Sequence, residues 1–177
     1  QVTSVTDSRL DIDLVITDPA WSALPLDLTA LSTAAVRAAM ATTAHDGGEV
    51  VVALGDDAWI RDLNARHRDR DTPTNVLAFP ADAHGRGLGL LGDLALARET
   101  IIAEAAAADK ALADHLTHLI VHGCLHLLGH DHIQADEAAR MEALEVRVLA
   151  DLGIDDPYQD QEADQAAPAV DLTTTHE

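Results

Sequence analysis

The chain is poor in cysteine, in aromatic residues and in long apolar runs, and each shortage excludes a class of protein. It has one cysteine in 177 residues, Cys124, so no disulfide can form within it and we expect a reducing, cytoplasmic location. Only 2% of the residues are aromatic, so aliphatic side chains must fill the core. No apolar run approaches the ~18 residues of a membrane span, and no segment has the pattern of a signal peptide. We therefore expect no contact with a membrane.

Basic residues are also scarce, because 11 Lys and Arg stand against 31 Asp and Glu, for a net charge of −20. A protein that binds nucleic acid over a broad basic surface is therefore excluded. The charge is unevenly spread. Residues 151–177 hold eight acidic residues and no Lys or Arg, whereas Arg61–Asp71 holds four Arg against three Asp. The second segment is where we expect a local positive binding site.

Periodicity in the sequence predicts one α+β domain over residues 1–158. Alternating, β-branched patterns predict strands over 10–17, 49–55, 74–80 and 93–97. Helical spacing predicts helices over 26–44, 112–128 and 135–153, with shorter ones ending near Arg68 and starting at Arg98. Residues 81–92 are interpreted as a glycine-rich loop. This order predicts a small mixed β-sheet packed with helices, followed by an acidic, disordered tail at 159–177.

Six of the ten histidines lie between residues 115 and 132. On a helical wheel of 112–128, four of them fall within an arc of about 80°, and the remaining circumference is apolar. They are His115, His118, His122 and His126. A helix that is apolar nearly all round is buried, so its polar stripe is expected to face a cleft. Cys124 lies on the other side of the wheel and is interpreted as a small core residue.

His122 and His126 are four residues apart, so both imidazoles can reach one metal ion. Gly129 lets the helix end in a left-handed turn, after which His132 can supply a third ligand. Three imidazoles suit one Zn²⁺ ion, and also Ni or Cu, and leave a coordination position open for water. Asp131 is expected to bond a ligand imidazole or to cap the turn, and His118 and His115 are expected to line the cleft.

The spacing of these histidines is also that of metzincin proteases, which carry a glutamate after the first ligand. Here that position is Gly123, and no acidic residue lies between His122 and His126. The general base of such a protease is missing, which argues against peptide hydrolysis by that route.

The segment "HGCLHLLGHDH" (122–132) closely resembles the H-G-x-L-H-L-x-G-Y-D-H signature of the YbeY family of bacterial endoribonucleases, the rRNA maturation factors. Three further blocks resemble the same family in the same order, and the resemblance covers roughly 10–158. They are "LNARHRDRDTPTNVLAFP" (63–80), "LGDLALA" (91–97) and "MEALEVRVLADLGIDDPY" (141–158). The chain departs from the family pattern where His130 and His67 replace Tyr, and where Ala78 replaces Ser.

The resemblance implies a metal-dependent hydrolase of single-stranded RNA that acts in rRNA processing, including maturation of the 3′ end of 16S rRNA, and in ribosome quality control. It implies His122, His126 and His132 as metal ligands and Arg68 as the functional arginine. A guanidinium beside a metal suits the charge that develops on a phosphate, which agrees with the location of Arg68 in the basic segment. We interpret Arg61 and Arg70 as solvated residues.

Three hypotheses follow from the sequence. The first is a zinc-dependent endoribonuclease that binds ribosomal RNA and a ribosome-associated protein. The second is a ribosome-assembly factor that binds RNA and has a mainly structural metal, and three ligands rather than four favour the first. The third is a metal hydrolase of other substrates, against which Gly123 counts. Asn64, Thr74 and Asn75 adjoin apolar runs and are expected to hold a loop or line the cleft.

Overall fold

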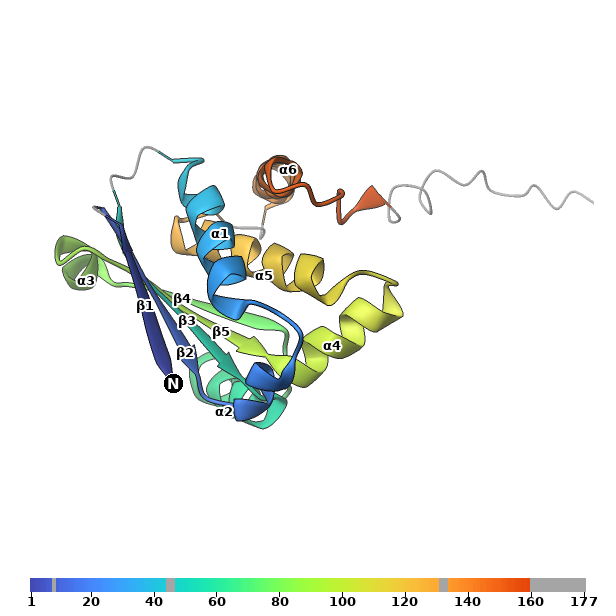
Figure 1. Cartoon of the computed structure of the whole chain (residues 1–177). Coiled ribbons are helices and arrows are strands. Elements are labelled where there is room, and N and C mark those ends of the chain that lie inside the picture. Colours follow the sequence, from blue (N-terminus) through green and yellow to red (C-terminus); the bar gives the residue numbers. More distant parts are fainter. Residues whose placement is uncertain (8, 44–46, 131–133, 160–177) are drawn as a thin grey trace, which may run out of the picture.

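A computed structural model describes residues 1–7, 9–43, 47–130 and 134–159. The chain forms one α+β domain with a single mixed sheet packed with helices, as the sequence predicts, and the helices lie on both faces of the sheet (Figure 1). The five strands are β1 (Val2–Asp7), β2 (Leu10–Ile16), β3 (Gly48–Gly55), β4 (Val76–Pro80) and β5 (Leu90–Ala97). The helices are η1 (Pro19–Ala23), α1 (Leu28–Met40), α2 (Asp57–Arg68), α3 (Ala83–Gly87), α4 (Arg98–Ala107), α5 (Leu112–Leu127) and α6 (Ala135–Asp151).

The strand order in the sheet is β1-β2-β3-β5-β4. The central strands β2, β3 and β5 run parallel, and β1 and β4 pair antiparallel at the two edges. Parallel neighbours need crossover connections, which α1 and α2 help to provide. The strand β4 is therefore an edge strand, with β5 on one side.

The two faces of β5 show why helices cover the sheet on both sides. Leu94 and Leu96 point into the main core under α1 and α5, while Ala95 and Ala97 pack with Ile60 of α2 on the other face. This alternation follows from the two-residue period of a strand. It makes β5 a strand that is buried on both faces, and α5 is the helix that packs against it.

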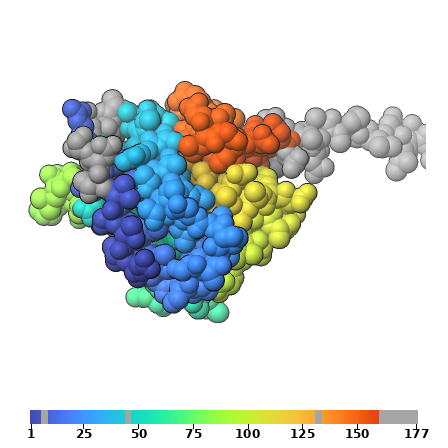
Figure 2. Space-filling model, in the orientation of Figure 1, coloured from blue at the N-terminus to red at the C-terminus, as the bar shows by residue number. Residues whose placement is uncertain are grey.

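The C-terminal helix α6 lies on α5 and α1, so that it covers the outer side of the histidine-bearing helix (Figure 2). Its buried residues follow helical spacing: Met141, Glu145, Val148 and Leu149. The helix ends at Asp151, Gly153 follows it with a φ of 75°, and the N–H of Ile154 donates to the carbonyl of Leu149 at 2.9 Å. This is the glycine-closed end that the sequence predicts.

Three elements are absent from the sequence-based prediction: β1, η1 and α3, of which η1 is a short helix capped by the Asp18 carboxylate. The strand β1 carries an alternating "VTSVTD" pattern but pairs only with β2 at the sheet edge. The helix α3 has the sequence "AHGRG" and lies inside the segment 81–92 that was interpreted as loop. Its helical propensity is low, and it depends on the Asp82 carboxylate, which accepts a hydrogen bond from the N–H of Gly85 at 2.8 Å.

The predicted tail lies outside the described residues except for its first member. No helix in the ranges described above is both long and apolar enough to cross a membrane.

Candidate active site

Beyond its first turn, where Asp114 is exposed, the helix α5 is buried except along its histidine stripe. Nine of its residues are buried. The four histidines on one side of the helix are partly exposed: His115, His118, His122 and His126. Cys124 is 1% exposed, and burial raises the pKa of its thiol to about 12, in agreement with its interpretation as a core residue. The stripe is therefore the part of α5 at which chemistry can take place.

Two glycines shape this helix. Gly123 allows α5 to approach β5 closely, because a Cβ there would lie 2.7 Å from Cδ2 of Leu94. Gly129 follows the helix with a φ of 96°, and its N–H donates to the carbonyl of His126 at 3.0 Å. The chain leaves α5 in the left-handed turn that the sequence predicts. Asp131 and His132, which follow this turn, lie outside the described residues.

His122 and His126 bring their Nε2 atoms to 3.2 Å from each other. Two nitrogen ligands of a tetrahedral zinc ion, each about 2.0–2.1 Å from the metal, would be about 3.3 Å apart. The spacing of the two rings therefore fits a pair of ligands on one ion. Both residues line a cavity of about 1000 Å³.

On its other side, His122 contacts a carboxylate that the sequence analysis did not identify. Glu145 of α6 is fully buried, and its Oε1 accepts a hydrogen bond from Nδ1 of His122. Its Oε2 accepts from the Tyr158 hydroxyl and from Nε2 of His118, the latter at 3.3 Å. Burial alone would raise the pKa of Glu145, but the hydrogen bonds from His118 and His122 lower it to about 2.

His118, His122 and Glu145 each offer a ligand atom within 4.8 Å of the other two, and this group can hold a metal ion. It differs from the predicted set, with which it shares only His122. The two sets use different nitrogens of that ring: Nδ1 faces Glu145, and Nε2 faces His126. His118 and Glu145 do not belong to the residues that line the cavity. His118 thus contacts Glu145, which in turn contacts the predicted ligand His122, and it is not among the residues that line the cavity.

Arg68 lines the same cavity as His122 and His126. It is exposed at the C-terminal end of α2, where its Nη2 donates to the carbonyl oxygen of Ala78 at 3.0 Å. Asn75 and Ala81 flank β4 and bond to β5 through their backbones. By the alternation of an antiparallel pair, the carbonyl of Ala78 points away from β5. Arg68 is therefore held against the open edge of β4.

Asn64 holds the loop that follows Arg68. It is 5% exposed, and its Nδ2 donates to the carbonyl of Thr72 at 2.8 Å. The backbone carbonyl of Asn64 accepts a hydrogen bond from the N–H of Asp69, which adopts the left-handed conformation with a φ of 53°. Asn64 also lines the cavity, so it combines the two roles that the sequence suggested for it.

Asn75 connects the cavity to a second carboxylate–histidine pair. Its Nδ2 donates to Glu104 at 3.1 and 3.3 Å, and His115 contacts the same carboxylate at 2.8 Å through Nε2. His115 does not belong to the lining of the cavity. The Glu104–His115 pair therefore resembles the Glu145–His122 pair in chemistry but lies away from the predicted ligands.

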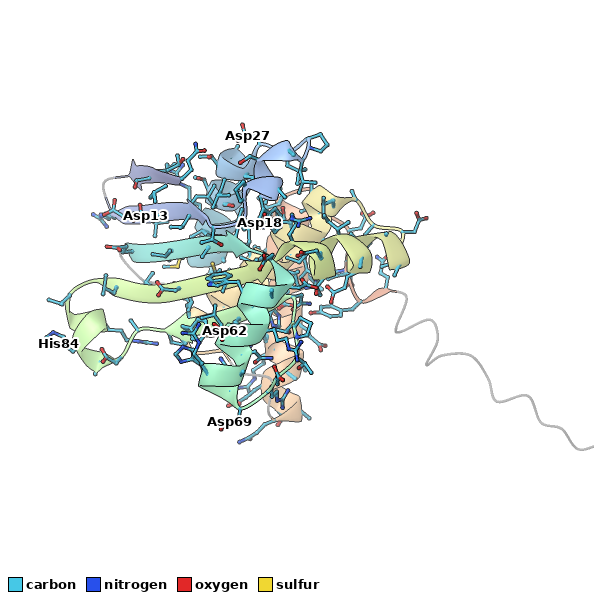
Figure 3. All side chains as sticks on the ribbon, turned by 90° about the horizontal axis from the view of Figure 1, so that it is seen from below. Asp13, Asp18, Asp27, Asp62, Asp69 and His84 are labelled. Atoms are coloured by element: carbon cyan, nitrogen blue, oxygen red, sulfur yellow. The ribbon has the colours of Figure 1, made fainter. Side chains whose placement is uncertain are left out.

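The arginines around α2 fall into two groups. Arg61 and Arg66 pair with Asp71 and Asp62 on the exposed side of the helix, and the Arg61–Asp71 distance is 2.7 Å. Figure 3 views this face of the sheet, with α2 in front of it and with Asp62 and Asp69 labelled. Arg70, which the sequence analysis treated as a solvated residue, is exposed but also lines the cavity.

The described lining of the cavity contains arginine and histidine but no acidic side chain. The lining residues with basic or imidazole side chains are Arg68, Arg70, His122, His126 and His130. In a chain with a net charge of −20, this is a local region suited to an anionic ligand.

Comparison with known proteins identifies relatives over most of the chain. A family model described as "Endoribonuclease YbeY" matches residues 22–153. A protein from Azorhizobium caulinodans named "Endoribonuclease YbeY" is 51% identical over 154 residues, covering 84% of this chain and 96% of that protein. A protein of the same name from Agrobacterium fabrum is 43% identical over 166 residues, covering 88% and 98%.

Among solved structures, the solution structure of TM1509 from Thermotoga maritima matches with a TM-score of 0.55. The match covers 93% of the present chain and 99% of the Thermotoga maritima protein, at 19% sequence identity. At this level of identity the likeness concerns the fold alone.

Proposed function

Because the chain belongs to the endoribonuclease YbeY family, we propose that it cleaves single-stranded RNA at a zinc centre, with Arg68 binding the phosphate. The family makes it a nuclease that acts on RNA phosphodiester bonds, with a role in rRNA processing. Within that role we propose maturation of the 3′ end of 16S rRNA and ribosome quality control. The proposed zinc ligands are His122, His126 and His132.

The observation that carries this proposal is the shared cavity. The two Nε2 atoms at 3.2 Å have the spacing of zinc ligands, and Arg68 lines the same space. A zinc ion with an open coordination position makes bound water acidic enough to supply a nucleophile near neutral pH. His122 and His126 would contribute two of the nitrogens that hold it.

The chain's own residues account for binding of the phosphate. One N–H of the Arg68 guanidinium donates a hydrogen bond to the carbonyl of Ala78, and this bond holds the planar group at the edge of β4. A guanidinium has five N–H donors, so others remain for phosphate oxygens, on which negative charge develops during hydrolysis. Arg70 adds a second positive charge to the lining.

The test is cleavage of a labelled single-stranded RNA by the purified full-length protein, together with its zinc content. His126→Ala should lose bound zinc and cleave at background, and Arg68→Ala should keep zinc but lose about 10²–10³-fold in kcat/KM. Arg61→Ala is the matched control, because Arg61 pairs with Asp71 outside the cavity lining. Equal cleavage by wild type and His126→Ala would identify a contaminating nuclease and refute the proposal.

One observation favours the second candidate, an RNA-binding assembly factor with a structural metal. In the group of His118, His122 and Glu145, only His122 lines the cavity, and Glu145 is completely buried. A metal held there would contribute to folding and not to cleavage. Removal of zinc distinguishes the two: a folded but inactive protein supports catalysis, and an unfolded one supports the structural metal.

The charge of the chain suggests how the RNA is selected. With a net charge of −20 and two arginines in the cavity lining, Arg68 and Arg70, we propose weak RNA binding that is aided by a ribosome-associated protein partner. The expected result is that cleavage of naked RNA is slow and that addition of ribosomal particles increases it.

A further inference from the structure

Glu145 is an unusual residue for the position that it occupies. It lies on the buried face of α6 among Met141, Val148 and Leu149, where an apolar residue would ordinarily pack. A carboxylate in such surroundings is costly unless its oxygens accept hydrogen bonds. Glu145 accepts three of them, from His122 at Oε1 and from His118 and Tyr158 at Oε2. The buried charge is therefore retained by a specific set of donors.

The contact between Glu145 and His122 determines which nitrogen of the ring carries the proton. An ionised carboxylate can only accept, so Nδ1 of His122 must be the donor. In a neutral imidazole the other nitrogen, Nε2, then carries no proton and presents its lone pair. That atom lies 3.2 Å from Nε2 of His126, and both rings line the cavity. The ring is thus prepared to bind a metal on the side of the cavity.

We propose that Glu145 is a positioning residue: it holds the proton on Nδ1 of His122 and fixes the ring, so that Nε2 points at the metal position in the cavity. This inference rests on the zinc centre of the proposed function. Tyr158 and His118 hold the second oxygen of the carboxylate, and Lys110 anchors the segment that carries Tyr158 by donating to the carbonyl of Pro157 at 2.9 Å.

The alternative is that Glu145 is itself a ligand together with His118 and His122. In that arrangement Nδ1 of His122 would have to give up its proton to coordinate the ion. The proton of His122 would then be on Nε2 and would face His126 in the cavity, so no metal could bind to Nε2. The cavity lining includes His122 and His126 but neither His118 nor Glu145, which favours the positioning role.

The first experiment measures the dissociation constant for zinc by competition with a chromogenic chelator. Glu145→Gln should raise this constant by about 10–100-fold, the usual cost of removing a carboxylate behind a ligand histidine. Glu104→Gln is the matched control, since Glu104 contacts His115 on the same helix, and its zinc affinity should not change. Unchanged zinc affinity of a folded Glu145→Gln would overturn the proposal. So would a larger loss in His118→Ala than in His126→Ala, which would make Glu145 a ligand.

The second experiment uses the unaltered, zinc-free protein, so it does not depend on the folding of a variant. Nitrogen-15 NMR of the histidine rings reports which nitrogen of His122 is protonated. We expect the proton on Nδ1, and a proton on Nε2 alone would overturn the proposal. Because this measurement needs no zinc, a failure of the zinc centre and a failure of the role of Glu145 give different results.

Discussion

A single added methyl group at Gly123 tests the packing that places the histidine stripe. A Cβ at this position would lie 2.7 Å from Cδ2 and 3.2 Å from Cδ1 of Leu94, whose side chain is fully buried under α5. Carbon atoms attract each other best at about 3.5–4.0 Å, so both contacts are too short. In Gly123→Ala, either Leu94 must change its rotamer or α5 must move away from β5.

Two opposing contributions determine the free energy of unfolding of Gly123→Ala. Extra atoms in a packed core typically cost about 1–3 kcal/mol. Replacement of glycine by alanine within a helix stabilises by about 1 kcal/mol. The expected net change is a destabilisation of up to about 2 kcal/mol. RNA cleavage should fall further than this loss accounts for, because displacement of α5 also moves His122 and His126.

The assay is urea unfolding of the zinc-free wild type, Gly123→Ala, Leu94→Ala and the double variant, followed by circular dichroism. Leu94→Ala removes the atoms that the new methyl group would meet, so in that background Gly123→Ala should stabilise by about 1 kcal/mol. The reasoning is refuted if Gly123→Ala stabilises the protein equally in both backgrounds. The glycine would then have no role in the approach of α5 to β5.

Three further outcomes follow from charges and burial. Cys124, whose pKa is raised to about 12 by burial, should not react with a thiol reagent at pH 8 until the protein unfolds, and prompt labelling of folded protein would contradict its placement. The hydrogen bond from Arg98 holds the pKa of Asp18 below its ordinary value. The ionised carboxylate therefore stabilises the fold fully when the pH is above the ordinary pKa of aspartate. This stabilisation is lost as the pH falls through the lowered pKa of the folded protein. The two side chains are only 14% and 22% exposed, so Asp18→Asn should cost about 1–3 kcal/mol at pH 7 and progressively less below about pH 4 in urea titrations. Because Arg68 and Arg70 are the arginines of the cavity lining, the binding constant for single-stranded RNA should fall with salt with a logarithmic slope of only about −1 to −2, whereas a steep slope would indicate a broader basic surface.

The parts of the site that could be predicted from the sequence are those encoded by neighbouring residues. Helical spacing places His122 and His126 on one side of α5, and Gly129 reverses the chain after it. The family resemblance implies Arg68 as the functional arginine, and Arg68 lines the cavity. The geometry of the two histidines and of the turn is fixed locally, whereas the cavity that Arg68 shares with them is formed by separate elements.

The parts that could not be predicted depend on contacts between distant elements. Glu145 is 23 residues from His122, and only the packing of α6 on α5 brings the two together. A signal was present in the sequence, since Glu145 interrupts the apolar side of an amphipathic helix, but periodicity does not say which residue it meets. The same holds for Glu104, which reaches Asn75 from α4. Weak helical preference explains why α3 was missed, whereas β1 carries the alternating pattern of a strand in its own sequence.

Packing against Leu94 requires a residue without a Cβ at position 123, and the carboxylates around α5 lie away from the described cavity lining. Glu145 contacts the Nδ1 side of His122, away from the residues that line the cavity, so its negative charge stays off the side where an RNA phosphate would approach. A glutamate in place of Gly123 would meet Leu94 at its Cβ and would bring a carboxylate to the cavity lining. In a metzincin protease that carboxylate is the required base, whereas here it would repel a phosphodiester. The fold therefore uses a carboxylate to hold the histidine while it leaves Arg68 and Arg70 to set the charge of the cavity.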